Sequence, residues 1–349
     1  MLTAAARYAF LDTRISILSE RLIQPAMFTA FLHTPESEQR AWLGAIGVDY
    51  QPGTPFDPQR LERAMNAALL RDVDQIIRPL DGEAREFFKH WAHRFELSNL
   101  KFIIRGRLHG QTPQSIKQEL VTLGQHERLP IDQLLAAEDI QELLRLLEQQ
   151  SHYAEIARQA RRALEEHHDA FILEATIDRH FFAGLSKLAQ HYKGAGHALL
   201  RELVGDLIDR VNLMWLLRYR FTYGLQPAEA YYLLVPTTGR LRSETLLAMA
   251  EADSFAQMRP LLPRHLAQWI GEAEHINDIH RHAKRGAHHR AEAILRRTRF
   301  NPARALAYLM LRESNLNRLA SVIRGYALQL DTAHIAHAVG ITTDPANAA

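Results

Sequence analysis

One apolar helical phrase, with its polar residues in fixed places, occurs three times along this chain. The copies cover residues 96–107, 209–220 and 315–326. The same place within the phrase is taken by Asn99, Asn212 and Arg318, at separations of 113 and 106 residues. A recurrence of this kind predicts three successive versions of one structural unit of roughly a hundred residues, which greatly narrows the possible folds.

The repeated phrase has the apolar spacing of an amphipathic helix. Leu97, Leu100, Ile104 and Leu108 follow one another at three- and four-residue steps, so they share one helical face. The runs 138–148 and 153–166 are rich in residues that lose little conformational freedom in a helix. Strand-like alternation is scarce. The sequence therefore predicts an all-α chain.

Matching elements flank each copy of the phrase. A turn and a further helical segment follow each copy, and an acidic residue on an earlier helix precedes it, namely Glu62, Glu174 and Glu292. That acidic residue lies 37, 38 and 26 residues before the respective Asn99, Asn212 and Arg318. We therefore expect three units at residues 1–112, 113–226 and 227–349, of which the third is shortened and degenerate.

The polar residues of the phrase are the candidate functional residues. Asparagine is unfavourable inside a helix, so its recurrence indicates a specific partner. One interpretation is that these side chains join neighbouring helices and only stabilise packing. Another is that the arginines present a repeated basic rim to a partner protein. We prefer packing and keep both. The candidates are Glu96, Asn99, Arg105, Arg107, Asp209, Asn212, Arg218, Arg220, Arg318 and Arg324.

Composition excludes several classes of function. The chain has 42 basic and 40 acidic residues, a net charge of +2, so nothing favours nucleic acid as a partner. It contains no cysteine, which excludes disulfides and thiolate metal sites. No apolar run reaches the roughly 18 residues that suggest a membrane span. The start of the chain does not resemble a signal peptide, so we expect a cytoplasmic protein.

Motifs for chemistry are weak. The glycine turn at 193–196 lacks the residues of a phosphate-binding loop, and no zinc-hydrolase motif occurs. Two Glu-x-x-His pairs, Glu165 with His168 and Glu272 with His275, have the spacing used by di-iron sites in helical bundles. With 19 histidines, chance explains them, but a di-iron enzyme stays an alternative. We expect no catalytic residue, cofactor, metal or direct small-molecule substrate.

Two further alternatives concern binding. Residues 280–299 are rich in His and Arg and form either a basic patch for acidic partners or a solvated helix face, and we prefer the solvated face. A helical-repeat adaptor or scaffold is also possible, because stacked helical repeats make concave binding surfaces. Such repeats are usually 34 to 47 residues long, whereas the period here exceeds a hundred.

The chain resembles the C subunit of V-type and A-type rotary ATPases, which is related to the d subunit of the eukaryotic V-ATPase. The resemblance lies in an acidic residue three positions before an Asn-Leu pair, followed by Ile-Ile-Arg-Gly-Arg or Leu-Leu-Arg-x-Arg, and in the order of the flanking segments. The matching segments are 8–22, 95–107, 173–181, 208–224 and 302–325. The third copy departs from the pattern, since Asn315, Arg318 and Tyr326 replace the acidic residue, the Asn and the last Arg.

This resemblance implies a fold, a role and partners. It implies three pseudo-equivalent helical subdomains arranged as a funnel with pseudo-threefold symmetry. It also implies a non-catalytic subunit of the central stalk, a socket that couples the rotor shaft of the soluble ATPase head to the membrane ring of proteolipid subunits during proton or sodium transport. The expected place is the cytoplasmic face of the membrane, as a peripheral part of the complex. The three units are not expected to make equivalent contacts.

Overall fold

The computed structural model describes residues 4–50, 57–124, 127–151, 153–167, 170–236 and 240–340, and the elements in these ranges are helices. No strand occurs within them, so the predicted all-α class is confirmed. The chain divides into two compact units, Met1–Leu80 with His288–Ala349 (unit 1) and Asp81–Ala287 (unit 2). The expected division after residues 112 and 226 stays a prediction.

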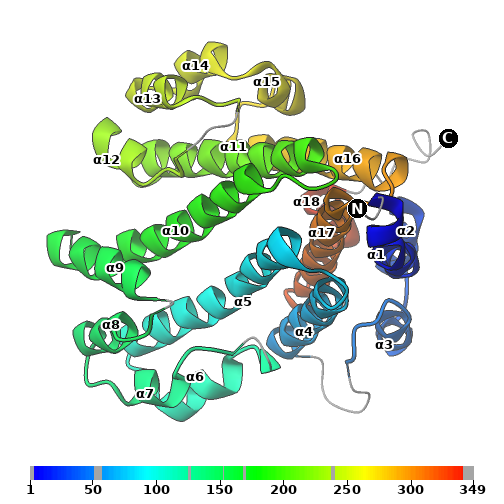
Figure 1. Cartoon of the computed structure of the whole chain (residues 1–349), viewed down its shortest axis with the longest axis horizontal. Helices are drawn as coiled ribbons and strands as arrows, with labels where there is room; N and C mark the ends of the chain where they lie inside the picture. The colour runs from blue at the N-terminus through cyan, green and yellow to red at the C-terminus, as the bar shows by residue number, and fades with distance from the viewer. Residues whose placement is uncertain are drawn as a thin grey trace. The chain divides into compact units, whose positions relative to one another are not determined.

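Unit 1 combines the two ends of the chain. Its helix α17 is contacted by α1, α4 and α18, and α1 also contacts α4 (Figure 1). Because α17 belongs to the last part of the sequence and α1 and α4 to the first, unit 1 depends on contacts between distant residues. Its helices are α1 (Ala4–Ser19), α2 (Pro25–Leu32), α3 (Glu36–Ala45), α4 (Pro58–Ile77), the end of α16 (Ile276–Arg297), α17 (Pro302–Ala327) and α18 (Thr332–Ala338).

Unit 2 is continuous in sequence. Its helix α10 packs against α9, α5 and α11, and α8 packs against α9 (Figure 1). Short helices follow α5 and α11. The helices of this unit are α5 (Gly82–Leu108), α6 (Pro113–Glu119), α7 (Ile131–Ala136), α8 (Ile140–Glu148), α9 (Ala154–His167), α10 (Ala170–His191), α11 (His197–Phe221), α12 (Pro227–Tyr232), α13 (Ser243–Glu251), α14 (Phe255–Met258), η2 (Arg259–Leu261), α15 (Arg264–Ile270) and the start of α16.

The three copies of the phrase lie near the C-terminal ends of α5, α11 and α17, which we call the signature helices. On α5, Leu97, Leu100 and Ile104 are buried as the spacing predicts. Leu108 is instead 45% exposed, because it is the last residue of its helix and lies beyond the packed part of the face. The apolar stripe therefore ends one turn earlier than the sequence suggests.

The connections after the signature helices follow the chemistry of their turn residues. Pro113 and Pro227 occupy the first position of α6 and α12, where a missing N–H breaks no helical hydrogen bond. Gly110 and Gly224 adopt φ values of 68° and 69°, which only glycine reaches without strain. Gln329 takes this conformation after α17, with φ of 56°. The three turns are thus alike, although the third is made without glycine.

Close helix packing explains a glycine in two of the three copies. A Cβ on Gly106 would lie 2.6 Å from Cγ1 of Ile116 on α6, and a Cβ on Gly325 would lie 2.7 Å from Cγ1 of Ile335 on α18. These distances are shorter than van der Waals contact, so glycine lets each short helix approach its signature helix. On α11 the corresponding residue is Tyr219, and the fourth residue of α12 is the small, fully buried Ala230.

Within the described ranges, we find no helix that is both long enough and apolar enough to span a membrane.

Candidate functional site

The asparagines of the first two signature helices bind backbone groups rather than ligands. The Asn99 side chain donates to the carbonyl of Val121 at 2.8 Å and accepts from the N–H of Val121 at 2.9 Å. Asn212 makes the same pair of bonds with Val235, at 3.0 and 2.9 Å. Each side chain therefore satisfies both polar groups of one backbone residue just beyond the next short helix.

Arg318 takes this position on α17 and binds the corresponding downstream segment through a single backbone carbonyl. Its Nε donates to the carbonyl of Val339 at 3.1 Å, in the segment that follows α18. Its guanidinium lies over the ring of Phe28, 4.4 Å from the centroid, which is close enough for a cation–π interaction. The longer side chain therefore joins α17 both to the downstream segment and to α2.

The residue three positions earlier accepts backbone N–H groups in all three helices. Glu96 Oε1 accepts from Arg128 and from Leu129, the second bond measuring 2.7 Å. Asp209 Oδ1 accepts from Leu241 at a longer 3.4 Å. Carboxylates suit this task because charge-assisted bonds to backbone N–H groups are stronger than neutral ones.

On α17 this residue is Asn315, and its partner comes from the other end of the chain. Asn315 Oδ1 accepts from the N–H of Ile23 at 2.8 Å. The corresponding partners on α5 and α11 lie about 32 residues downstream, whereas Ile23 lies 292 residues upstream. The role of the side chain is kept although the segment it binds is different.

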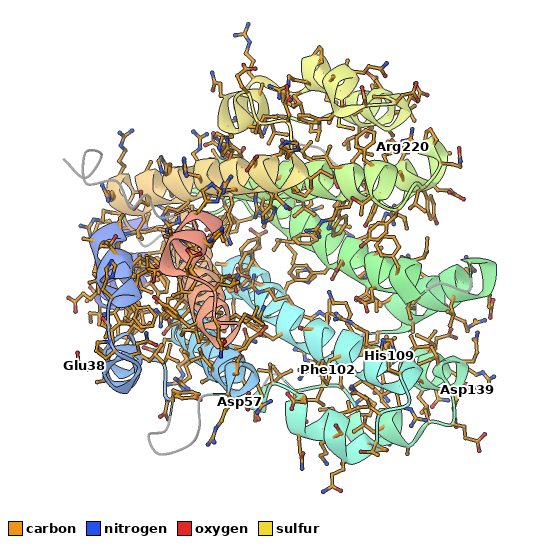
Figure 2. The ribbon with its side chains drawn as sticks, turned by 180° about the vertical axis from the view of Figure 1, so that it is seen from behind. Glu38, Asp57, Phe102, His109, Asp139 and Arg220 are labelled. Carbon is orange, nitrogen blue, oxygen red and sulfur yellow. The ribbon has the colours of Figure 1, made fainter. Side chains whose placement is uncertain are left out.

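The last polar residue of the phrase also binds backbone carbonyls. Arg107 donates to Ala137 and to Glu138, the second bond measuring 3.1 Å. Arg220, labelled in Figure 2, donates to Ala250 at 2.6 Å and also to Leu225 and Ala252. On α17 the equivalent bond runs from the Tyr326 hydroxyl to the carbonyl of Leu32. The replacement of Arg by Tyr therefore coincides with a third contact between the α17 phrase and the N-terminal segment.

The remaining arginines of the phrase differ in how they are paired. Arg105 forms an ion pair of 2.6 Å with Glu174 on α10, and Arg324 forms one with Glu62 on α4. These carboxylates are two of the acidic residues that recur upstream of the phrase in the sequence. Arg218 on α11 is exposed and makes no ion pair with the described residues of unit 2. Glu292, the third recurring carboxylate, pairs with Arg296 on its own helix.

Unit 1 contains a buried ionic network that sequence analysis did not identify. Asp72 on α4 and Arg312 on α17 are fully buried and 3.2 Å apart. Asp72 also accepts from Arg21 at 2.6 Å and from Tyr308 at 2.7 Å, and burial together with this carboxylate raises the pKa of the Tyr308 hydroxyl. Arg312 further donates to the carbonyls of Arg21 and Ile46. The charges therefore compensate each other inside the core.

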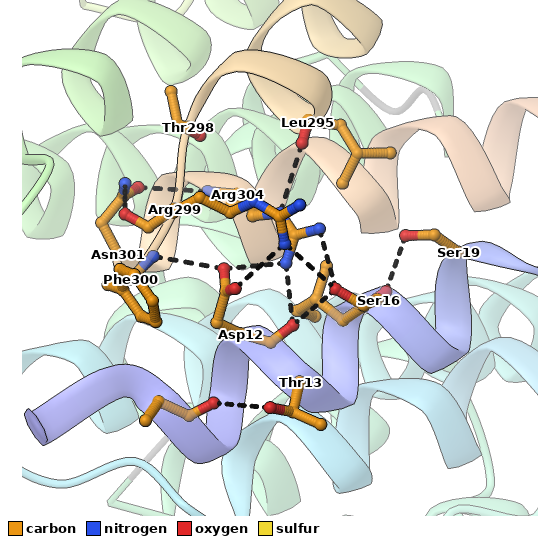
Figure 3. A network of polar contacts seen from close by, with 12 residues as sticks. Asp12, Thr13, Ser16, Ser19, Leu295, Thr298, Arg299, Phe300, Asn301 and Arg304 are labelled. Atoms are coloured by element: carbon orange, nitrogen blue, oxygen red, sulfur yellow. Dashed lines mark hydrogen bonds and ion pairs between the residues drawn. The ribbon is translucent and has the colours of Figure 1, made fainter. Parts of the chain in front are cut away.

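A second network joins the start of α17 to α1 (Figure 3). Arg304 donates to Asp12 Oδ1 and to the Asp12 carbonyl, both at 2.8 Å, and to Ser16 at 3.1 Å. Arg299 lies 3.2 Å from the other carboxylate oxygen of Asp12. The N–H of Phe300, which has a φ of 55°, also donates to Asp12. One carboxylate on α1 thus fixes the turn that opens α17.

Buried titratable groups in unit 2 lie where helices pack. His90 on α5 is hydrogen-bonded to the Phe181 carbonyl at 2.9 Å, and burial lowers its pKa. Burial also lowers the pKa of His180, and it lowers the pKa of His280 to about 4 with help from nearby basic residues. His265 lies 3.1 Å from Asp209. The His90 hydrogen bond therefore joins α5 to α10.

Sequence similarity to known proteins identifies the family of this chain. The family model of the ATP synthase (C/AC39) subunit matches residues 11–338. The chain belongs to the ATP synthase (C/AC39) subunit family. Curated relatives include the C subunit of the A-type ATP synthase of Pyrococcus horikoshii, 23% identical over 91% of this chain and 86% of the relative, and that of Thermococcus kodakarensis, 22% identical over the same shares. The Methanosarcina mazei protein of the same name is 21% identical over 70% and 68%.

Membership of the ATP synthase (C/AC39) subunit family, a family of V/A-type ATPase subunits, confirms the resemblance seen in the sequence. It also fits the use of the signature residues, which bind backbone groups and neighbouring helices. Their assignment as interaction or packing residues stays a proposal.

The arrangement of the two Glu-x-x-His pairs does not support the di-iron alternative. Glu272 and His275 lie between α15 and α16, so they do not share a helical face as their spacing suggested, and Glu272 is 3.4 Å from Arg259. His168 lies outside the described residues. In the part of the chain that the structure describes, no group of three His, Asp or Glu side chains is arranged to hold a metal ion.

The His- and Arg-rich segment 280–299 is helical over most of its length, as part of α16. Several of its side chains have local partners: Arg281 pairs with Asp278, His282 binds the Ile270 carbonyl at 3.0 Å, and Arg299 pairs with Asp12. Its exposed side chains include Arg285 and also Arg296, which pairs with Glu292 on the same helix. A role in binding acidic partners stays a proposal for this exposed face.

Proposed function

We propose that this protein is the non-catalytic socket of a V/A-type rotary ATPase. In this proposal it couples the rotor shaft of the soluble head to the membrane ring of proteolipid subunits, and torque passes through it during proton or sodium transport. It sits as a peripheral subunit on the cytoplasmic face of the membrane. The three signature helices are related by a pseudo-threefold axis within a funnel-shaped protein.

The observation that carries the proposal is the threefold use of side chains as backbone clamps. At equivalent positions, α5, α11 and α17 each bind the segment that follows the next short helix. A part that transmits torque needs helices that keep their places under load, and paired bonds from buried side chains to backbone groups restrict such movement. Membership of the ATP synthase (C/AC39) subunit family supports the same role.

Arg218 is the signature residue best suited to contact a partner. Its counterparts Arg105 and Arg324 are occupied by Glu174 and Glu62, whereas Arg218 is exposed and lacks such a carboxylate among the described residues of unit 2. An exposed arginine binds carboxylates through a fork of parallel N–H groups. Arg218 is therefore proposed to bind an acidic side chain of a shaft or ring subunit.

Purification of the affinity-tagged chain from its native membranes tests the proposed function. Head and ring subunits are expected to co-purify, and the purified assembly but not the isolated chain is expected to hydrolyse ATP. ATP hydrolysis by the isolated chain, or repeated purification without ring and head subunits, would contradict the proposal.

The Arg218 contact is tested separately. Arg218→Glu is expected to lower the yield of co-purified subunits several-fold, because it replaces an attractive charge by a repulsive one. Arg162→Glu, at an exposed arginine of α9, is the matched control and should leave the yield unchanged. If both variants assemble equally well, the role of Arg218 is wrong although the socket function stands.

A further inference from the structure

Four contacts join α17 to a segment from the start of the chain, residues 23–46, which we call the clasp. The clasp contains α2 and α3 and precedes α17 by more than 250 residues. The contacts are Asn315 to the Ile23 N–H, Arg318 over the Phe28 ring, Tyr326 to the Leu32 carbonyl and Arg312 to the Ile46 carbonyl. Three of these four α17 residues belong to the repeated phrase, so the clasp occupies signature positions.

The spacing inside the clasp matches that of the segments bound by α5 and α11. The first and last phrase residues of α5 bind Leu129 and Ala137, those of α11 bind Leu241 and Ala250, and those of α17 bind Ile23 and Leu32. These pairs are separated by eight, nine and nine residues. The clasp is therefore equivalent to segments 129–137 and 241–250.

The secondary structure of the three segments agrees independently with this equivalence. A short helix begins two residues after the first contact in each case: α7 at Ile131, α13 at Ser243 and α2 at Pro25. The short helix thus starts at the same position relative to the first contact in all three segments. This holds although two of the segments follow their signature helix and one precedes it. A chance contact of the N-terminal segment with α17 would not reproduce both features.

The clasp is attached separately from the helix that precedes it. Helix α1 is held by Asp12 and Arg304, whereas the clasp is held by the signature contacts and by its own buried rings, Phe28 and Phe31. We propose that the clasp is the displaced part of the third repeat and acts as a latch that holds unit 1 closed. The latch can open along α17 while α1 and unit 2 keep their structure.

Thiol labelling of the full chain tests this latch, because the chain has no cysteine of its own. The Leu32→Cys substitution places a buried reporter in the clasp, and Ala137→Cys places one at the equivalent site of the first repeat. With a labelling reagent slower than reclosing, the rate reports the open fraction at each site. Each reporter is measured with and without a change at Asn315.

Asn315→Leu removes the acceptor for the Ile23 N–H and is expected to speed labelling of the Leu32→Cys reporter about tenfold, without changing the Ala137→Cys reporter. Asn315→Asp restores the acceptor found in the other two repeats and should keep labelling within about twofold of the original rate. As the matched control, Glu96→Leu removes the acceptor for the Leu129 N–H and should speed only the Ala137→Cys reporter.

Three results would overturn the proposal. The Leu32→Cys reporter could be unaffected by Asn315→Leu, both reporters could accelerate together, or Asn315→Asp could label as fast as Asn315→Leu. The first would show that the contact does not hold the clasp. The second would show that the clasp opens only with the whole chain, and the third that the acceptor at this position is not what matters.

Discussion

Helices α5 and α17 carry versions of one phrase, yet they take their partners from opposite directions along the chain. Glu96 and Arg107 on α5 bind backbone groups about 30 residues downstream. Asn315 and Tyr326 on α17 bind backbone groups about 290 residues upstream. The signature helix therefore specifies which backbone groups are bound, an N–H at one end and a carbonyl at the other, and leaves open which segment supplies them.

This difference has an energetic consequence. Closing a flexible loop costs entropy that grows with the logarithm of its length, so the Asn315–Ile23 contact is roughly 2 kcal/mol less favourable than the Glu96–Leu129 contact in an unfolded chain. If unit 2 folds first, the effective loop becomes shorter. The arrangement therefore favours folding of the continuous unit before the unit that joins both ends.

We expect the largest effect from a substitution that destabilises only unit 1, the unit that joins both ends of the chain. Asp72→Ala leaves Arg312 buried without its carboxylate, which should lower the free energy of unfolding of unit 1 by about 3–5 kcal/mol. Denaturant titration and hydrogen exchange measure this loss. Exchange should accelerate in residues 302–327 and stay slow in 197–221.

Asp132→Ala is the control for this change. Asp132 pairs with Lys117 on the surface of unit 2, and its side chain is 82% exposed, so its loss should change stability little. An equal effect of the two substitutions, or equal acceleration of exchange in both units, would contradict the separation of the units.

A smaller effect, that of acid pH, is expected on the stability of unit 2, which is continuous in sequence. The pKa values of His90, His180 and His280 lie below the usual histidine value in the folded state. Unfolding therefore takes up protons, and their contribution to stability is present above about pH 6.5 and is lost as pH falls toward the pKa of His280 at about 4. Hydrogen exchange corrected for intrinsic rates should show unit 2 weakening first between pH 7 and pH 5.

His280→Asn provides the control, because asparagine cannot gain a charge in this range. The pH dependence of unit 2 should become shallower in this variant. Burial raises the pKa of Asp206, which acts in the opposite sense and stabilises the folded unit as pH falls. An unchanged profile in His280→Asn would show that this histidine is not a source of the acid sensitivity.

The smallest effect is expected where the two units are alike. The pairs Arg105–Glu174 and Arg324–Glu62 occupy equivalent positions, and both arginines are more than half exposed. Double-mutant cycles to alanine should give coupling energies of about 0.2–1 kcal/mol in each case, because exposed ion pairs are screened by water. A much larger coupling energy for one pair would show that the two ion pairs are not energetically equivalent, although their positions in the repeat are.

The sequence predicted what depends on local spacing. Helical class and the burial of Leu97, Leu100 and Ile104 both follow from the short spacing of apolar residues along the chain. Chain reversals were also predictable from proline and glycine. These features are set by the helical period and by backbone preferences, which act independently of tertiary structure.

Contacts between distant segments could not be predicted in the same way. Nothing near Asp72 indicates Arg312, which lies 240 residues later, and nothing near Ile23 indicates Asn315. One signal was available: the phrase departs from its pattern at Asn315, Arg318 and Tyr326, where the partners include the clasp. A change of side chain at a repeated position can therefore mark a change in the segment that it binds.

The packing of the short helices restricts the order in which such repeats can diverge. Gly106 faces Ile116, and Gly325 faces Ile335, whereas the corresponding residues of the middle repeat are the large Tyr219 and the small Ala230. Enlarging the glycine first would overlap the isoleucine, but shrinking the isoleucine first only leaves a cavity. A repeat that changes from the glycine–isoleucine pair to the tyrosine–alanine pair must therefore lose the isoleucine side chain first and pass through the cavity. The fold thus fixes the order of the two mutations.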